Sequence, residues 1–231
     1  MDTAAVTELY EGLRVADVRD GMDWAGLHAK GTVSPDIAPL FEGARMYGRA
    51  HTVRHRLSEK AVPPVTGDEY TEWAYKYWYG ELYSHRHVSA NLVAGEVVVV
   101  ESPPGVAVGE LGSNNTLAWY ADGAAGIVTS GGVRDRDECV LQKVPMFCRT
   151  RAQSMVQGRV EFDTTQVPVN IGGVLVRPGD VVVADGDGVI VVPVEHAETV
   201  AKYARQELEN DKVGRRKIYE RLGWELDDTV R

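Results

Sequence analysis

The sequence predicts a mixed α/β protein whose sheet is parallel in its middle, and two observations support this fold class. Short β-branched runs, such as residues 97–100 and 126–129, alternate with longer stretches of helical periodicity. No shift in composition marks a linker, so a single domain is expected over residues 1–231. A long charged segment closes the chain and predicts a C-terminal helix over residues 194–223.

The first half of the chain predicts three helical segments and two strands. Residues 4–20 alternate apolar and charged positions at helical spacing, and a helix is also expected between residues 111 and 122. Strands are expected at residues 43–54, which contain glycine breaks, and at residues 97–100. Residues 68–91 are rich in Tyr and Trp and predict mostly helix. Their aromatic side chains predict core packing, with a pocket wall or a subunit interface as the alternative.

The second half predicts short strands, one helix between the first two of them, and a hairpin. The strands are expected at residues 126–129, 145–148, 167–176, 181–183 and 189–192. The helix is expected over residues 136–142. The segment Asp185-Gly186-Asp187-Gly188 predicts the turn of the hairpin. It is not a calcium loop, because the twelfth position is His196 where such a loop requires Glu.

Composition and charge exclude several classes of function. The net charge of −9 argues against nucleic-acid binding, which needs a clustered basic face, and favours a divalent cation wherever an anionic substrate is held. No stretch approaches the roughly 20 apolar residues of a membrane span. The N-terminus lacks the pattern of a signal peptide, so a cytoplasmic location without a membrane partner is expected. Cys139 and Cys148 are too few for a disulfide framework.

The first candidate site is Gly112-Ser113-Asn114-Asn115, which is expected to open a helix. The free amides at a helix N-terminus, together with the positive end of the helix dipole, bind carboxylate or phosphate groups. The alternative is that Ser113 or Asn114 only caps the helix.

The second candidate site is Gly131-Gly132-Val133-Arg134-Asp135, which follows an expected strand. This position lies at the carboxyl edge of the sheet, where ligands of open α/β sheets bind, and the two glycines are expected to let the backbone approach a ligand. The guanidinium of Arg134 suits a carboxylate, and the carboxylate of Asp135 suits magnesium or manganese. The alternative is a surface ion pair with Asp135 as the helix N-cap.

The histidines predict no metal site of their own. His51 and His55 lie four residues apart on an expected strand, which separates their side chains too far to share a zinc ion. His85 and His87 lack a third ligand nearby. A histidine close to the site is left as a candidate acid or base.

Several motifs give the chain a resemblance to the RraA-like family, which includes the divalent-metal 4-hydroxy-4-methyl-2-oxoglutarate / 4-carboxy-4-hydroxy-2-oxoadipate aldolases. The motifs are Gly123-Ala124-Ala125-Gly126-Ile127-Val128, Gly131-Gly132-Val133-Arg134-Asp135, Val144-Pro145-Met146-Phe147, Val176-Arg177-Pro178-Gly179-Asp180 and Asp185-Gly186-Asp187-Gly188-Val189. The resemblance covers roughly residues 10–220. It implies a swivelling β/β/α-type fold, assembly as a homotrimer or homohexamer, and sites between subunits.

The resemblance also implies the chemistry. The substrate would be a small 2-oxo acid, cleaved by retro-aldol reaction or decarboxylation through a pyruvate enolate stabilised by Mg²⁺ or Mn²⁺. Asp135 would bind the metal, Arg134 would hold the carboxylate or keto oxygen of the ligand, and the backbone of residues 112–115 would cradle the carboxylate. A glutamate from a neighbouring subunit's terminal helix contributes in such aldolases, and Glu207 and Glu209 are the candidates.

The sequence departs from the family pattern at two positions. The aldolases follow Gly-x3-Asp-x20-Arg-Asp; Gly109, Arg134 and Asp135 fit, but Ser113 stands at the acidic position. Ser130 stands where an acid often precedes the Arg by four residues. One alternative is therefore a related metal-dependent lyase or isomerase acting on a different oxo- or hydroxy-acid. Another is a non-enzymatic regulator of RNase E, against which the presence of Asp135 counts.

Overall fold

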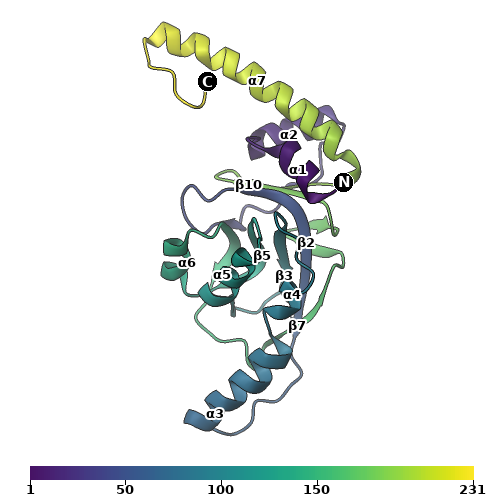
Figure 1. Ribbon diagram of the computed structural model, residues 1–231, viewed down its shortest axis with the longest axis vertical. Helices are drawn as coiled ribbons and strands as arrows, with labels where there is room; N and C mark the ends of the chain where they lie inside the picture. The colour runs from purple at the N-terminus through teal and green to yellow at the C-terminus, as the bar shows by residue number, and fades with distance from the viewer.

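The computed structural model describes residues 1–231 and contains one large sheet with helices around it (Figure 1). The helices are α1 (Thr3–Tyr10), α2 (Val15–Trp24), α3 (Gly67–Trp73), η1 (Ala74–Leu82), α4 (Arg86–Ser89), α5 (Ser113–Ala121), α6 (Arg136–Gln142), η2 (Val194–His196) and α7 (Ala197–Leu222). The strands are β1 (Ala38–Pro39), β2 (Met46–Leu57), β3 (Val97–Glu101), β4 (Gly109–Leu111), β5 (Gly126–Val133), β6 (Met146–Arg151), β7 (Val160–Thr165), β8 (Val169–Ile171), β9 (Val174–Val176), β10 (Val181–Asp185) and β11 (Gly188–Val192).

The middle of the sheet is parallel, as the sequence predicts. The strand order is β1-β6-β5-β3-β2-β10-β11, and β2, β3, β5 and β6 pair in parallel. β4 pairs in parallel with β5, while β7 and β10 pair antiparallel with β2. The mixed α/β fold class is thereby confirmed, and β4 is placed beside the strand that leads into the candidate site.

The two faces of the parallel strands pack against different layers, because successive side chains on a strand alternate. Val98 and Val100 of β3 pack with Trp119 of α5 and Cys139 of α6. Val97 and Val99 face the hairpin formed by β8 and β9. A separate cluster joins α1, α2 and α7 to β10 and β11. Figure 1 accordingly shows α7 at the opposite end of the molecule from α3.

Most of the expected elements are present, and two of the differences occur at glycines. The helix expected over residues 4–20 is two helices, α1 and α2, because Gly12 has a φ of 76° and interrupts the helical path. The strand expected over residues 167–176 is the β8–β9 hairpin, which turns at Gly172 and Gly173 with positive φ angles. β5 is longer than expected and continues through Gly131 and Gly132 to Val133. Strands β1, β4 and β7 are not among the expected elements.

The aromatic segment is helical, as predicted, but its middle is unusual. Its nine central residues form the π-helix η1, between α3 and α4. Trp78 is fully buried against Val108 and Val160, which confirms core packing for this residue. Tyr75 is 70% exposed, so the segment also presents aromatic surface. None of the helices has the length and apolar character needed to cross a membrane.

The C-terminal segment is a long helix, as expected. α7 runs for 26 residues and ends at Gly223, which adopts the left-handed conformation typical of a helix C-terminus. The only buried residues of this helix lie in its first half, up to Leu208. Figure 1 shows the second half extending beyond the rest of the molecule.

Candidate functional site

Arg134 and Asp135 lie at the carboxyl end of β5, where the sequence analysis places them. The amide of Arg134 donates to the carbonyl of Leu111, which extends the pairing between β4 and β5 by one residue. The side chains are 34% and 33% exposed, and Nε of Arg134 lies 3.2 Å from Oδ1 of Asp135. The two groups therefore form an ion pair at the surface of a cavity, with part of each left free for a ligand.

The side chain of Asp135 does not cap its own helix. Asp135 occupies the N-cap position of α6 in a left-handed conformation with a φ of 53°, and it makes no side-chain capping bond there. Instead, its Oδ2 accepts a hydrogen bond of 3.2 Å from the amide of Ser113. A non-glycine residue in this conformation costs free energy, which the surrounding structure must offset. The strained backbone aims the carboxylate at the start of α5.

The N-terminus of α5 faces the same point, so the two candidate sites are one site. Gly112 is the N-cap residue, where Ser113 or Asn114 was the expected alternative. The Oδ1 atom of Asn115 accepts a hydrogen bond of 2.8 Å from the amide of Gly112. The amide of Ser113 is bonded to Asp135, but the amides of Asn114 and Asn115 have no acceptor within the helix and can bind an anion beside Arg134.

Glu110 is a functional candidate that the sequence analysis does not identify. It lies on β4, and its side chain is fully buried. Oε2 lies 2.8 Å from Nδ1 of His55 and accepts a hydrogen bond of 2.7 Å from Oγ of Ser102. Oε1 is buried and has no hydrogen-bond partner. A buried carboxylate oxygen without a hydrogen-bond partner is costly, which makes Glu110 a candidate for a functional role.

Tyr83 connects Glu110 to the aromatic segment. Its hydroxyl donates a hydrogen bond of 3.0 Å to the backbone carbonyl of Glu110 and lies 3.4 Å from Nδ1 of His55. Burial, with further contributions from Glu110 and Tyr79, raises the pKa of Tyr83 well above its ordinary value. Tyr83 therefore remains a neutral hydrogen-bond donor at physiological pH.

Two histidines on β2 pair with two different buried carboxylates. His55 contacts Glu110, whereas Nδ1 of His51 lies 3.2 Å from Oε2 of Glu96. Only Glu110 belongs to the cavity. The chain contains no group of three or more His, Cys, Asp or Glu side chains arranged to hold a metal ion.

The glycines of the site make room for the protein's own side chains. A Cβ atom on Gly131 would lie 2.2 Å from Oγ of Ser102 and 2.8 Å from Oε1 of Glu110. A Cβ atom on Gly132 would lie 2.3 Å from the carbonyl oxygen of Val108. The expectation that Gly131 and Gly132 let the backbone approach a ligand is therefore wrong, because other atoms of the protein occupy the space beside both glycines.

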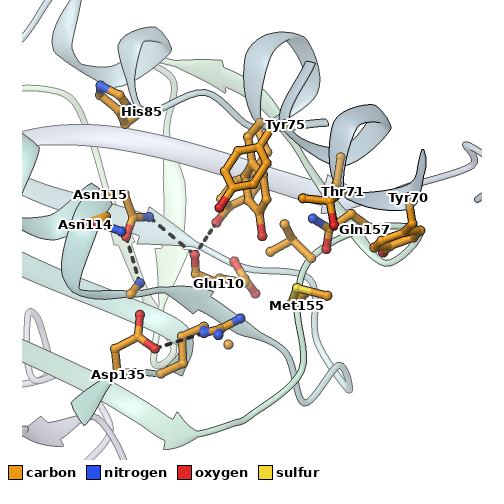
Figure 2. A pocket seen from close by; sticks show the side chains of 17 residues that line it. Tyr70, Thr71, Tyr75, His85, Glu110, Asn114, Asn115, Asp135, Met155 and Gln157 are labelled. Atoms are coloured by element: carbon orange, nitrogen blue, oxygen red, sulfur yellow. Dashed lines mark hydrogen bonds and ion pairs between the residues drawn. The ribbon is translucent and has the colours of Figure 1, made fainter. Parts of the chain in front are cut away.

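Glu110, Tyr83, Arg134, Asp135 and residues at the start of α5 line one cavity of about 580 Å³. Figure 2 shows Asn114, Asn115 and Asp135 at one end, Glu110 in the middle, and Tyr70, Met155 and Gln157 at the other end. The cavity is lined by Tyr70, Thr71, Ala74, Tyr75, Tyr79, Tyr83, His85, Gly109, Glu110, Gly112, Asn114, Asn115, Arg134, Asp135, Met155, Val156 and Gln157. Its charged side chains thus lie at one end and in the middle, whereas Tyr70 of α3 lies at the other end, and α3 and η1 together supply an aromatic wall.

A second, smaller cavity shares Arg134 and Asp135 with the first. Its volume is about 410 Å³, and Arg136 and Arg151 also line it. The Arg134–Asp135 pair therefore lines both a cavity rich in arginine and a cavity with an aromatic wall.

The two serines that depart from the family pattern have different surroundings. The backbone of Ser113 binds Asp135, and Oγ of Ser130 accepts a hydrogen bond of 2.9 Å from the amide of Ser102. Ser102 in turn binds Glu110. Glu110 thus brings a carboxylate close to the position where Ser130 lacks one. One signal for it exists in the sequence, because Glu110 is a single charged residue inside the apolar run from Val106 to Leu111.

Glu207 and Glu209 lie on α7, which packs against α1 and α2 and not against the helices of the site. Glu209 lies 3.2 Å from Lys212 of the same helix. Within one chain, therefore, neither glutamate is part of the cavity.

Comparison with known proteins agrees with the fold. Residues 15–191 match the RraA-like family model, described as Aldolase/RraA. Because this range covers most of the chain, the protein belongs to the RraA-like family. The RraA-like fold expected from the sequence is confirmed by its structural neighbours. One of them, Streptomyces coelicolor RraAS2, is described as an unusual member of the RNase ES inhibitor RraA protein family. It has a TM-score of 0.72 at 25% identity, covering 93% of this chain and 97% of that one.

Two sequence relatives are named as aldolases. A 4-hydroxy-4-methyl-2-oxoglutarate aldolase from Thermus thermophilus is 29% identical over 176 residues, which are 74% of this chain and 90% of that protein. A putative 4-hydroxy-4-methyl-2-oxoglutarate aldolase from Halalkalibacterium halodurans is 38% identical over 98 residues, which are 42% of this chain and 45% of that protein. The chain therefore matches less than half the length of the second relative.

Proposed function

We propose that the protein is a lyase that cleaves a 2-oxo acid to release pyruvate, with a divalent cation as cofactor. The observation that carries the proposal is the convergence of Arg134, Asp135, the N-terminus of α5 and Glu110 on one cavity. The names of the aldolase relatives support the same reaction class.

Arg134 and the start of α5 bind the acid end of the substrate. The guanidinium offers several N–H donors in a plane, which match a carboxylate or the adjacent 2-oxo oxygen. The amides of the first turn of α5 add donors whose dipoles point at the same position. Because these donors are held by the strand end and the helix, they stabilise the negative charge that develops as the enolate of pyruvate forms.

Asp135 is the residue that would hold Mg²⁺ or Mn²⁺. Each of its oxygens accepts only one hydrogen bond, at 3.2 Å, so lone pairs remain free. Magnesium commonly binds proteins through one or two carboxylates and completes its coordination with water and substrate oxygens, which fits a site with a single protein carboxylate. When bound there, the cation would supply Lewis-acid stabilisation of the 2-oxo group.

Glu110 removes the proton from the C4 hydroxyl of the substrate. Oε2 is held by His55 and Ser102, which fixes the carboxylate and leaves Oε1 free. As Oε1 accepts the hydroxyl proton, the C3–C4 bond breaks and the C4 oxygen becomes a carbonyl. The electron pair passes to C3 and the 2-oxo group, and protonation of C3 yields pyruvate. Glu110 thus performs work for which Ser113 and Ser130 have no carboxylate.

The test is direct measurement of pyruvate. The protein is incubated with Mg²⁺ or Mn²⁺ and either oxaloacetate or a 4-hydroxy-2-oxo acid, and pyruvate is followed with lactate dehydrogenase. Release of pyruvate by the wild type, lost in Asp135→Asn, is the expected result. The absence of turnover with every 2-oxo acid tested would exclude the proposal.

Two other functions remain to be compared with this one. A related lyase or isomerase on another oxo- or hydroxy-acid is favoured by Ser113 and Ser130, and a screen of such acids with the same metals distinguishes it. Regulation of an RNase is favoured by the Streptomyces neighbour. Inhibition of RNase E that is unchanged in Asp135→Asn, together with no pyruvate release, would support regulation instead.

We also propose that the chain assembles as a homotrimer or homohexamer with sites at the subunit interfaces. The second half of α7 supports this, since Val213, Ile218 and Leu222 are exposed on a helix that extends beyond the rest of the molecule (Figure 1). Glu207 or Glu209 of this helix is then the candidate for entering a neighbouring site. Light scattering coupled to size exclusion measures the mass, and a mass of one chain, 25.3 kDa, would contradict the assembly.

A further inference from the structure

The end of the cavity furthest from Arg134 has no charged side chain. Figure 2 shows Tyr70, Met155 and Gln157 together at this end, and Tyr75 and Tyr79 of η1 line the cavity with Tyr70 of α3. Of the charged groups that line the cavity, Figure 2 shows Asp135 at the α5 end and Glu110 in the middle, and Arg134 forms an ion pair with Asp135. A substrate held by Arg134 therefore extends toward neutral, largely aromatic surface.

The aromatic wall is a built feature of the fold. Tyr75 and Tyr79 pack with their ring centroids 5.9 Å apart, and Tyr70 packs on Trp73 at 5.6 Å. Trp78 anchors the same segment in a core with Val108, Val156 and Val160. The π-helical winding of η1 is rare and is frequently found at functional sites.

This surface discriminates between two kinds of substituent at C4 of the substrate. Aromatic rings gain from offset or edge contacts with tyrosine, in addition to the burial of apolar area. A second carboxylate placed at this end would lose hydration without meeting a cation, which is unfavourable. Arg136 and Arg151 line the second cavity. Arg159 donates through Nη1 to the backbone carbonyls of Met155 at 3.1 Å and Gln157 at 3.3 Å, but it does not line the first cavity.

We infer that the preferred substrate is a 4-hydroxy-2-oxo acid that carries an uncharged aromatic group at C4. The inference rests on the proposed lyase function and assigns its substrate class. Cleavage breaks the C3–C4 bond, the C4 hydroxyl loses its proton and becomes the carbonyl of an aromatic aldehyde, and C3 gains a proton to give pyruvate. No oxidant or further co-reactant is required.

The test compares two substrates that differ only at C4. The first, 4-hydroxy-2-oxo-4-phenylbutanoate, yields pyruvate and benzaldehyde; the second, 4-hydroxy-2-oxoglutarate, yields pyruvate and glyoxylate. Both are assayed with Mg²⁺ or Mn²⁺ by pyruvate release. The expected kcat/KM is at least about tenfold higher for the phenyl compound, which is the range of selectivity that an apolar pocket provides.

Variants separate selectivity of the cavity from the intrinsic reactivity of the two substrates. Tyr79→Ala is expected to lower the ratio of kcat/KM for the phenyl compound to that for the dicarboxylate about tenfold. Tyr79→Arg is expected to shift the preference toward the dicarboxylate. Tyr120→Ala is the matched control, because Tyr120 lies on the exposed surface of α5 outside the cavity. Its preference is expected to equal that of the wild type.

The outcomes are distinct. Preference for the phenyl compound that falls in Tyr79→Ala supports the inference. Preference for the dicarboxylate, or a ratio that Tyr79 variants leave unchanged, overturns the inference while the lyase function stands. No pyruvate from either compound or from oxaloacetate refutes the lyase function and the substrate class with it.

Discussion

Replacement of Glu110 by Gln removes the carboxylate from the middle of the cavity while keeping the shape of the side chain. The buried Oε1 has no partner, and Oε2 receives hydrogen bonds from His55 and Ser102. An amide at this position cannot accept the C4 hydroxyl proton. The Glu110→Gln variant therefore tests whether this residue performs proton transfer.

The magnitude follows from the role. A positioned general base contributes about 10²–10⁴-fold, so kcat is expected to fall by that factor. KM is expected to change little, because Arg134 and the start of α5 hold the acid end of the substrate. The loss of charge-assisted hydrogen bonds to His55 and Ser102 is expected to lower the free energy of unfolding by roughly 1–3 kcal/mol.

A second buried Glu–His pair provides the control. Glu96 contacts His51 on the same strand β2, at 3.2 Å, but does not line the cavity. Glu96→Gln is expected to lose stability of similar size and to retain kcat. The assay is steady-state pyruvate release for both variants, with urea denaturation in parallel. A kcat for Glu110→Gln that stays within about tenfold of wild type, or an equal loss in both variants, would refute the reasoning.

Three further predictions follow from close contacts and buried groups. Gly112→Ala is expected to lower activity about 10²-fold, since its Cβ would lie 2.5 Å from Oδ2 of Asp135 and displace that carboxylate. Gly186→Ala is the control and is expected to leave activity unchanged, because a Cβ there would have no atom within 4 Å. Activity unchanged in Gly112→Ala would contradict this geometry. Burial of Glu96 opposes ionisation, but the hydrogen bonds from His51 and the amide of Val93 outweigh it and lower the pKa below its ordinary 4.5. The ionised carboxylate of Glu96 thus stabilises the protein above about pH 4.5, and this contribution is lost as the pH falls below that value. The urea midpoint is therefore expected to fall less steeply with decreasing pH in Glu96→Gln than in the wild type. Burial raises the pKa of Cys148 to about 11 and also raises the pKa of Cys139. In the native protein, neither thiol is therefore expected to react rapidly with a disulfide reagent at pH 8. In urea, both thiols are expected to react. Rapid reaction in the native state would contradict the burial of the two thiols.

Much of the fold is predictable from the sequence, because most of its elements have a strong local pattern. The β-branched runs of β3 and β5 and the charged periodicity of α7 specify their secondary structure without reference to the rest of the chain. The β8–β9 hairpin is harder to predict. Its six strand residues look like one strand, and only the positive φ angles at Gly172 and Gly173 turn the chain back.

The site is predictable in part, for a physical reason. Arg134, Asp135 and the residues at the start of α5 occupy the ends of regular elements, where ligand binding is expected from topology. Glu110 is different, because its importance arises from His55, Ser102 and Tyr83, which lie far from it or on other elements. Only the three-dimensional arrangement shows that Glu110 and the tyrosines of α3 and η1 line the same cavity.

The most direct test of the account is pyruvate release from a 4-hydroxy-2-oxo acid by the wild type and by Asp135→Asn, each with Mg²⁺, with Mn²⁺ and with a chelator. The account predicts turnover by the wild type that depends on the added cation and disappears in the variant. Turnover that survives both the chelator and the loss of Asp135, or no pyruvate from the wild type under any condition, would contradict the account.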